Sequence, residues 1–564
     1  MADRSSEEKR PDSSSGVDSA SPKEVEAGQN APTLADKEAL TTVTSPSDDQ
    51  TPYLQGIKLF FVMASVTLVI LLAMLDISIL STAIPQITSD FHRLGDVGWY
   101  IGAYQLASAT VQPLTGKLFT YFNTKARRSP STNAVGSAVC GAATSSAMLI
   151  GGRSVAGVGA SGLVNGGLTI ILGACEPSVR PLGQLGIILG PLLGGIFTEH
   201  VSWRWCFYIN LPFGGVAGLF MILVSVPEQM AKQPPSLAYI RSLIPHFDLT
   251  GFALFAPASI MFLLALQFGA GEYGWNSSEV IGLFCGAGVT AIIFGLWERR
   301  MGDEAMIPFP MVRQKIMWSS SLSYALLMSS IVVGSNFVPI FLQSVKGLSP
   351  TMSGVYMLAT IIPQLILVIV SGALVTKFGY YLPWIVGSAA CTAIGAGLIS
   401  TWQPSTSLGK LLGYQILFGS RGAGMQMGVI AIQHHLPAKM VAIGNSFLVF
   451  SQNFAGAIFI TIANTIFQES LKSTINSNVP GISPDAAVAA GGSAGAVRAL
   501  APPGPLRDAL FGAYSDGFTH VFYLVISTCC VAFFVSFGMG WVDLRVKKEH
   551  KKATTPQQEE ANTE

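Results

Sequence analysis

Apolar stretches long enough to cross a membrane recur along the chain from Ile57 to Trp541, and short polar segments separate most of them. A helix rises about 1.5 Å per residue, so about 20 apolar residues cross the hydrocarbon core of a bilayer. The pattern predicts an all-α polytopic membrane protein with about fourteen transmembrane helices. The expected spans are residues 57–80, 99–118, 134–150, 153–175, 182–198, 205–226, 250–270, 279–297, 317–342, 352–374, 382–401, 409–431, 441–467 and 518–541.

Both ends of the chain are polar. Residues 1–52 are rich in Ser, Asp, Glu, Lys and Pro without apolar periodicity, which predicts a disordered tail. Residues 542–564 form a second polar tail. Half of the chain is hydrophobic and 12% is charged, roughly half the charged fraction of soluble domains. The net charge of +1 gives no indication of a nucleic-acid partner.

The distribution of Lys and Arg predicts the orientation, because cytoplasmic segments are enriched in these residues. An even number of spans places both termini on one side of the membrane. Outside the N-terminal tail, nineteen Lys and Arg residues fall on that side and seven on the other. We therefore expect both termini in the cytoplasm. Residues 468–517, rich in Ala, Gly, Ser and Pro, are then expected to form a long, mobile extracellular loop.

A short internal repeat indicates two related halves. Residues 116–122 and 372–378 both read G-x-L-x-T-x-F, and both end an even-numbered span on the cytoplasmic side. Transporters are commonly built from such repeats. Two unrelated helix ends that match by chance are the alternative.

Asp76 lies about twenty residues into an otherwise apolar run. An ionised carboxylate at membrane depth is costly unless it is paired or protonated, and such residues usually mark an ion or substrate path. A structural carboxylate that is hydrogen-bonded to a neighbouring helix is the alternative.

Arg153 begins the fourth expected span, in a segment where Gly157 and Gly159 allow a neighbouring helix to approach closely. A guanidinium does not lose its proton, but it lowers the pKa of a nearby carboxylate. A proton-coupled carrier needs such an arrangement. Alternatively, Arg153 extends to the outer membrane interface.

The fifth expected span is dense in glycine and proline. Such a helix is kinked and closely packed in a bilayer, where its neighbours satisfy the freed backbone groups. Its role is structural, and a gating hinge would use that structure. The residues are Gly186, Gly190, Pro191, Gly194 and Gly195.

The second half of the chain offers polar groups but almost no acids at membrane depth. Together with Phe and Met side chains they suit a cavity for a bulky, mostly apolar solute. The possible lining residues are Asn336, Gln343, Gln415, Arg421, Gln426, Gln452 and Asn453.

The sequence lacks the motifs that are typical of several kinds of chemistry. No G-x-x-x-x-G-K-[ST] loop is present to bind nucleotide phosphates, so energy comes from an ion gradient or transport is passive. The cysteines lie mostly in apolar segments, which argues against a disulfide framework or a metal site. We expect no cofactor and no metal. An enzyme is the least favoured class, because no His cluster, carboxylate pair or nucleophile–base set stands out.

Four motifs follow one another in the order of the spans: L-D-x-x-I-L-x-x-A-I-P at 75–85, R-x-x-x-G-x-G at 153–159, G-x-x-x-G-P-x-x-G-G at 186–195 and W-R-W-x-F-Y-I-N-L-P at 203–212. With them the chain resembles the major facilitator superfamily, and within it the fourteen-span drug:proton antiporters of filamentous fungi. The resemblance implies six-helix bundles at 53–226 and 317–541. Residues 227–316 would link them through two extra spans.

The resemblance also implies export of toxins, drugs or secondary metabolites against proton entry by alternating access. Asp76 and Arg153 would belong to the coupling apparatus, and Gly190 with Pro191 to the gate. The loop 2–3 motif would comprise Gly116, Lys117, Thr120 and Lys125.

The chain departs from this family at three places. Thr120 stands where the superfamily commonly has Asp. Polar residues 126–133 shorten the third span, and residues 175–183 form a loop shorter than usual.

The first functional hypothesis is thus a monomeric, proton-coupled exporter of hydrophobic small molecules in the plasma membrane, or alternatively in the vacuolar membrane. A siderophore or basic amino acid transporter is a second hypothesis, which acidic cavity residues would favour. A third is a non-transporting sensor or a non-functional pseudo-transporter, which the shortened span permits.

Overall fold

The structure is a computed structural model, and it describes residues 68, 72, 75, 76, 79–91, 96–121, 129–174, 185–223, 247–270, 273–490 and 494–545. All these residues belong to one compact unit, residues 53–564. The regular structure within them is helical, with no strand, which confirms the predicted all-α class. The expected N-terminal tail, 1–52, lies outside the described residues.

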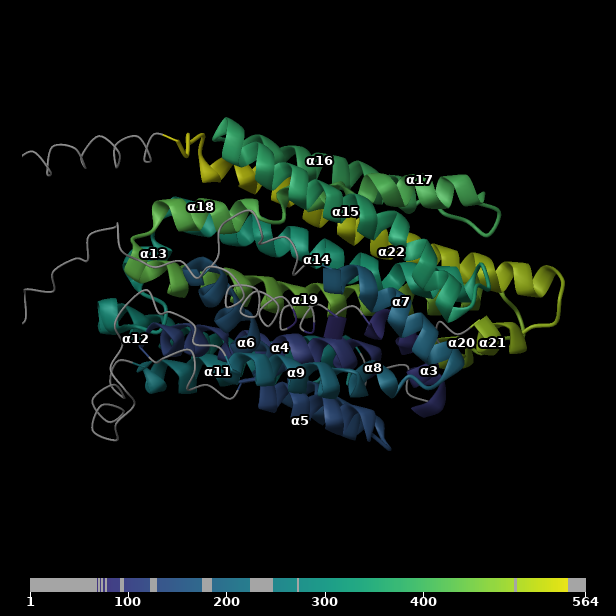
Figure 1. Ribbon diagram of the computed structural model, residues 1–564. Helices are drawn as coiled ribbons and strands as arrows, with labels where there is room; N and C mark the ends of the chain where they lie inside the picture. The colour runs from purple at the N-terminus through teal and green to yellow at the C-terminus, as the bar shows by residue number, and fades with distance from the viewer. Residues whose placement is uncertain are drawn as a thin grey trace, which may run out of the picture. The chain divides into compact units, whose positions relative to one another are not determined.

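The first part of the described chain forms seven helices (Figure 1). They are α3 (Leu80–Phe91), α4 (Val97–Tyr121), α5 (Ser129–Gly141), α6 (Ser146–Ala174), α7 (Leu185–His200), α8 (Trp205–Tyr208) and α9 (Asn210–Leu223). Two longer helices follow, α11 (Leu249–Ala270) and α12 (Ser278–Met301).

The remaining helices run through the second part of the chain. They are η5 (Gly302–Glu304), α13 (Phe309–Val312), α14 (Lys315–Ser344), α15 (Pro350–Phe378), α16 (Leu382–Ile399), α17 (Leu408–Phe418), η6 (Gly419–Gly424), α18 (Met427–His435), α19 (Ala438–Asn478), α20 (Pro484–Ala490), α21 (Ala494–Ala499), α22 (Pro505–Ser536) and η7 (Phe537–Met539).

Helix α6 packs closely on α4 and α5 because glycines face both neighbours. A Cβ added at Gly157 would collide with the main-chain oxygen of Tyr104 on α4. One added at Gly159 would collide with the backbone of Asn133 on α5. Close backbone approach through small residues is the usual way in which membrane helices associate.

Helices α11 and α12 pack against each other, and α11 also contacts α4 and α19. The rings of Phe262 and Phe284 join the pair, with centroids 5.9 Å apart. Phe255 meets Phe450 of α19 at 5.1 Å, and Thr461 Oγ1 donates to Gln267 Oε1 at 3.0 Å. The pair is thus attached at a place where α4 and α19 meet.

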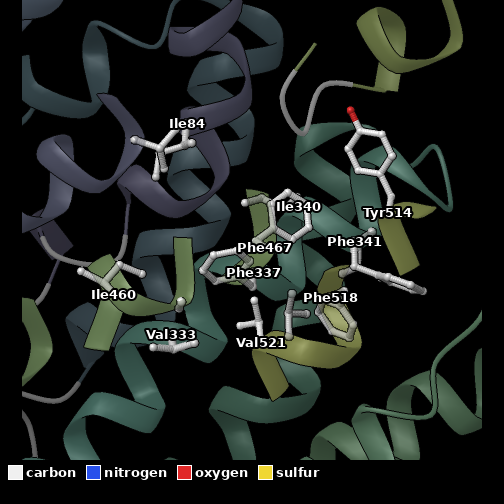
Figure 2. Close-up of a cluster of buried hydrophobic side chains, with 14 of the residues drawn as sticks. Ile84, Val333, Phe337, Ile340, Phe341, Ile460, Phe467, Tyr514, Phe518 and Val521 are labelled. Atoms are coloured by element: carbon white, nitrogen blue, oxygen red, sulfur yellow. The ribbon is translucent and has the colours of Figure 1, made fainter. Parts of the chain in front are cut away.

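A cluster of buried apolar side chains joins helices from distant parts of the chain (Figure 2). Ile84 of α3 and Phe337 of α14 belong to it, together with Phe467 of α19 and Phe518 of α22. Phe337 and Phe467 have ring centroids 5.5 Å apart. This cluster brings the first helix of the described chain together with the second half.

Much of the remaining apolar surface is exposed. On α12, Ile292 and Leu296 are 65% and 64% exposed. A soluble monomer rarely leaves such contiguous apolar surface in water, so these faces suit contact with lipid tails. Eight described helices are long and apolar enough to cross a membrane, namely α6, α11, α12, α14, α15, α16, α19 and α22.

The prediction that residues 468–517 form an irregular loop is wrong. Helix α19 continues to Asn478, α20 and α21 follow, and α22 already begins at Pro505. Leu471 and Ile475, one helical turn apart, are buried, and so are Ala487 of α20 and Val497 of α21. The mean hydropathy of the sequence does not predict these helical segments, because each segment buries only one of its faces.

The predicted boundary between the third and fourth spans is also wrong. Helix α5 ends at Gly141 and α6 begins at Ser146, whereas the sequence predicted a break near 151–152. The hydroxyl of Ser145 accepts from the backbone N–H of Met148 at 3.3 Å, as a helix N-cap does. Arg153 therefore lies in the second turn of α6.

Candidate functional site

Asp76 and Arg153 form an ion pair in the interior of the protein. Arg153 Nη1 lies 3.1 Å from Asp76 Oδ1, and the two side chains are 2% and 1% exposed. Asp76 belongs to helical residues that precede α3, and Arg153 belongs to α6. The alternative in which Arg153 extends to the membrane interface is therefore wrong.

Helix α4 fixes the position of the guanidinium. Arg153 Nε donates to the main-chain oxygen of Tyr100 at 3.0 Å. The guanidinium carbon lies 4.2 Å from the ring centroid of Tyr104, within the range of a cation–π interaction. Arg153 thus connects α4, through two different contacts, to the segment that carries Asp76.

Asn210, at the start of α9, adds a second donor to the carboxylate. Its Nδ2 donates to Asp76 Oδ1 at 3.3 Å and to Ser137 Oγ of α5 at 3.1 Å. The sequence motif at 203–212 by itself indicated no role for Asn210. The side-chain amide of Asn210, within an apolar run, is the sequence signal that could have identified it as a partner of a buried carboxylate.

The two oxygens of Asp76 differ. Oδ1 accepts from Arg153 and Asn210, while Oδ2 is buried and has no hydrogen-bond donor among the described residues. The buried hydroxyl of Tyr104 lies near this carboxylate, although no hydrogen bond of normal length and angle joins them. One oxygen of this buried carboxylate is thus left without a hydrogen bond from the described residues.

The glycine-rich motif places α7 between two other helices. A Cβ at Gly194 would collide with Ile79 O, beside α3. A Cβ at Gly195 would lie 2.8 Å from Thr351 Cα of α15. Gly186, Gly190 and Pro191 belong to α7, but their surroundings lie outside the described side chains.

The loop 2–3 motif lies where α4 meets the second half. A Cβ at Gly116 would collide with the Ser446 hydroxyl of α19. Lys117 is buried, and its Nζ donates to the main-chain oxygen of Glu304 at 2.7 Å. Thr120 belongs to α4 with its side chain outside the described set, and Lys125 lies outside the described residues.

Polar contacts also join the halves along α4 and α19. Asn453 Nδ2 donates to Ser108 Oγ at 3.1 Å. Ser446 Oγ donates to Asn165 Oδ1 at 3.2 Å, and Gln112 Nε2 donates to the same oxygen at 2.8 Å. Hydrogen bonds of this kind between helices can break and reform when the halves move.

The other suggested lining residues do not meet at one place through the described contacts. Thr360 Oγ1 donates to Gln415 Oε1 at 3.1 Å, and Arg421 Nε donates to Gln364 Oε1 at 2.8 Å. Asn336 and Gln343 are buried on α14, and Gln426 and Gln452 are half-buried. Their role as cavity lining stays a prediction.

A buried acidic group that the sequence analysis did not single out connects the middle helices. Asp248, just before α11, accepts from Trp297 Nε1 at 2.7 Å, Gly251 N at 2.8 Å and Met306 N at 3.0 Å. Burial alone would raise the pKa of Asp248, but these hydrogen bonds hold the pKa below its usual value. The carboxylate joins α11 and α12 to the segment that leads to α14.

Comparisons with known proteins agree with this architecture. The family model described as Major Facilitator Superfamily matches residues 66–460. The MFS-type transporter calB of Penicillium decumbens is 48% identical over 526 residues, which cover 91% of this chain and 94% of calB. The efflux pump mlcE of Penicillium citrinum is 44% identical, with 91% of this chain and 96% of mlcE covered.

Solved structures show the same fold at low sequence identity. A bacterial homologue of the human lysosomal transporter Spinster has a TM-score of 0.53 and 14% identity, with 86% of this chain and 98% of that chain covered. A D-xylose–proton symporter also has a TM-score of 0.53, with 13% identity and 86% and 98% of the two chains covered.

Proposed function

Because the chain belongs to the major facilitator superfamily, we propose that it is a proton-coupled efflux transporter that exports hydrophobic small molecules by alternating access. It is a multi-pass membrane protein with the all-α fold of that superfamily. Relatives at 44–48% identity over most of the chain include efflux pumps of filamentous fungi. Their similarity favours export as the direction of transport.

The observation that carries proton coupling is the buried ion pair between Asp76 and Arg153. Protonation of the carboxylate removes one charge of the pair. The charge on Arg153 remains, because a guanidinium keeps its proton. Uptake or release of one proton therefore changes the attraction between the helix that carries Asp76 and α6.

Such a change can reach the contact between the halves. Gly194 of α7 lies against Ile79, three residues after Asp76, and Gly195 of α7 lies against Thr351 at the start of α15. A shift of the Asp76 segment therefore acts on α7, and α7 acts on α15. We assign the gating role of the glycine-rich motif to these two close contacts.

We also propose the domain organisation, orientation and location that members of this family share. Residues 53–226 and 317–541 form the two halves, and 227–316 provide the linking helices. Both termini lie in the cytoplasm, and the protein works as a monomer in the plasma membrane. A vacuolar location is the alternative, which imaging of a fluorescent fusion in the native fungus would distinguish.

Efflux from a drug-hypersensitive yeast, measured for a panel of hydrophobic compounds with and without a protonophore, tests the function. Wild-type protein is expected to lower the accumulation of at least one compound, and the protonophore is expected to abolish this effect. Export that persists with the protonophore would contradict proton coupling. Absence of export of any compound would favour the pseudo-transporter hypothesis.

A further inference from the structure

The second half repeats the spacing of the coupling pair without its carboxylate. Asp76 stands nine residues before Pro85 of α3, and Ser330 stands nine residues before Pro339 of α14. The expected first helix of each half thus carries a polar residue at the same distance from a proline. By this spacing, Ser330 is the counterpart of Asp76.

Each of these residues faces an arginine from a later helix of its own half. Arg153 Nη1 donates to Asp76 Oδ1 at 3.1 Å. Arg421 Nη1 reaches the main-chain oxygen of Ser330 at 3.5 Å, the long limit of a hydrogen bond. Arg421 is therefore the counterpart of Arg153, but it meets a neutral residue.

The helices that flank the two arginines correspond as well. In the first half, a Cβ at Gly159, six residues after Arg153, would collide with Asn133 of α5. In the second half, a Cβ at Gly424, three residues after Arg421, would lie 2.8 Å from Ser388 Oγ of α16. The shorter spacing accompanies the 3-10 segment η6, which interrupts the helix at Arg421.

Arg421 is held firmly although no acid faces it. It is 1% exposed, Nε donates to Gln364 Oε1 at 2.8 Å, and its guanidinium carbon lies 4.3 Å from the ring centroid of Phe418. Among the described residues, no carboxylate forms an ion pair with it, and its Nη2 has no acceptor.

A buried guanidinium without a counter-charge is costly, and proteins usually pair such a group. The side chain has five N–H donors, and two of them are used here. Its planar fork matches a carboxylate in shape and charge. The site therefore has one positive charge and free donors fixed in position by Gln364 and Phe418.

We propose that Arg421 recognises a carboxylate on the exported molecule, so that the cargo supplies the charge that Asp76 supplies in the first half. This inference rests on the proposed export function and restricts it to organic acids with a hydrophobic body. Phe418 contacts the guanidinium face and leaves its edge for the ligand. The site is closed to solvent in this conformation, and cargo enters it in another state of the transport cycle.

Export of 1-pyrenebutyric acid and of its methyl ester tests the proposal, because the two probes share one fluorescent hydrophobic body and differ in charge. Variants Arg421→Gln and Ser330→Asp are compared with wild type in hypersensitive yeast, at equal membrane abundance. Ser330→Asp keeps the guanidinium and offers it an internal carboxylate. Ser330→Asn has the same size without the charge and serves as the matched control.

Wild type is expected to export the acid. Arg421→Gln and Ser330→Asp are expected to lower the ratio of acid to ester export at least about tenfold, the size of one lost charge-assisted hydrogen bond. Ser330→Asn is expected to change this ratio less than about twofold. An equal loss of both probes in Arg421→Gln, or an unchanged ratio in Ser330→Asp, contradicts the proposal.

Export of the ester but not of the acid by wild-type protein also contradicts the proposal that Arg421 recognises a carboxylate. If this export of the ester is sensitive to the protonophore, the proposed function as a proton-coupled exporter is unaffected. Export of neither probe contradicts the restriction to organic acids. An inorganic anion could use the same donors, so the assay is repeated in chloride-free sulfate medium. If the effect of Arg421→Gln on the ratio disappears there, the site binds chloride and the cargo assignment is wrong.

Discussion

Asp76 and Arg153 are 77 positions apart in sequence, and their side chains meet at 3.1 Å in a buried ion pair. Asn210 donates to the same carboxylate oxygen as the arginine, so one oxygen is occupied and the other is open among the described residues. A pair of this kind can respond to a single proton.

Replacement of either member of the pair is expected to abolish export. Asp76→Asn removes the charge that a proton would neutralise, and Arg153→Ala leaves the carboxylate without its cation. Drug resistance of the hypersensitive yeast is expected to fall to that of cells without the transporter, at unchanged membrane abundance. The matched control is Asp485→Asn, because Asp485 also pairs with a cation but is 85% exposed.

Arg153→Lys is expected to behave like the alanine variant rather than like wild type. An ammonium cannot donate from both Nε and Nη1, so it keeps either the contact with Tyr100 or the one with Asp76. Initial efflux rates are expected to fall at least about tenfold, for loss of one charge-assisted hydrogen bond. A rate within twofold of wild type would show that positive charge alone is sufficient.

Asn210→Leu tests the residue that the sequence analysis missed. The substitution keeps the size of the side chain but removes the donor to Asp76 and Ser137. We expect a loss of about 1–3 kcal/mol in stability and slower export, measured by thermal unfolding in detergent and by efflux. Normal stability combined with normal export would remove Asn210 from the coupling site.

The close contact between α7 and α15 is tested by Gly195→Val. The added side chain would be forced against Pro350 and Thr351, so the two helices could not pack as they do here. Export is expected to be lost while the protein is still inserted. Gly214→Val on α9 is the control, because a Cβ there meets nothing within 4 Å, and its export is expected to equal that of wild type.

The Asp248 group is expected to stabilise the protein without a direct part in coupling. Asp248→Asn weakens the hydrogen bonds that the carboxylate accepts from Trp297, Gly251 and Met306. The free energy of unfolding is therefore expected to fall by about 1–3 kcal/mol. Because the pKa of Asp248 is below its usual value, its stabilising effect is present above that value, about 3.9, and is lost only as the pH falls through the folded pKa.

Titration of Asp248 itself therefore adds no pH dependence to the stability difference between wild type and Asp248→Asn between about pH 5.5 and about pH 8. A change within this range would come from the carboxyl group of Glu298, which is hydrogen-bonded to Asp248. Thermal unfolding of the two purified proteins across this range measures the difference. A difference that disappears altogether near pH 6 would show that Asp248 itself takes up a proton there.

The apolar runs of the sequence predict most of the helices well, because a membrane helix must be apolar along its whole length. Helix α14, expected at 317–342, extends from Lys315 to Ser344. The prediction of a loop at 468–517 was wrong because α20 and α21 bury only single residues, such as Ala487 and Val497. Local composition does not reveal such packing.

The sequence predicts only part of the candidate site, for a similar reason. Asp76 and Arg153 stand out because an ionisable residue in an apolar run has few structural explanations. Tyr100 contributes through its main-chain oxygen, which carries no sequence signal, and Asn210 resembles other polar residues near helix ends. Their roles depend on which helices become neighbours.

Proton movement in reconstituted vesicles tests the central claim most directly. Purified wild type and Asp76→Asn are placed in liposomes with an internal pH dye, and an outward gradient of an exported compound from the panel is applied. Wild type and the Asp485→Asn control are expected to move protons opposite to the compound, while Asp76→Asn is expected to move none. Equal proton movement by Asp76→Asn and wild type would contradict the account.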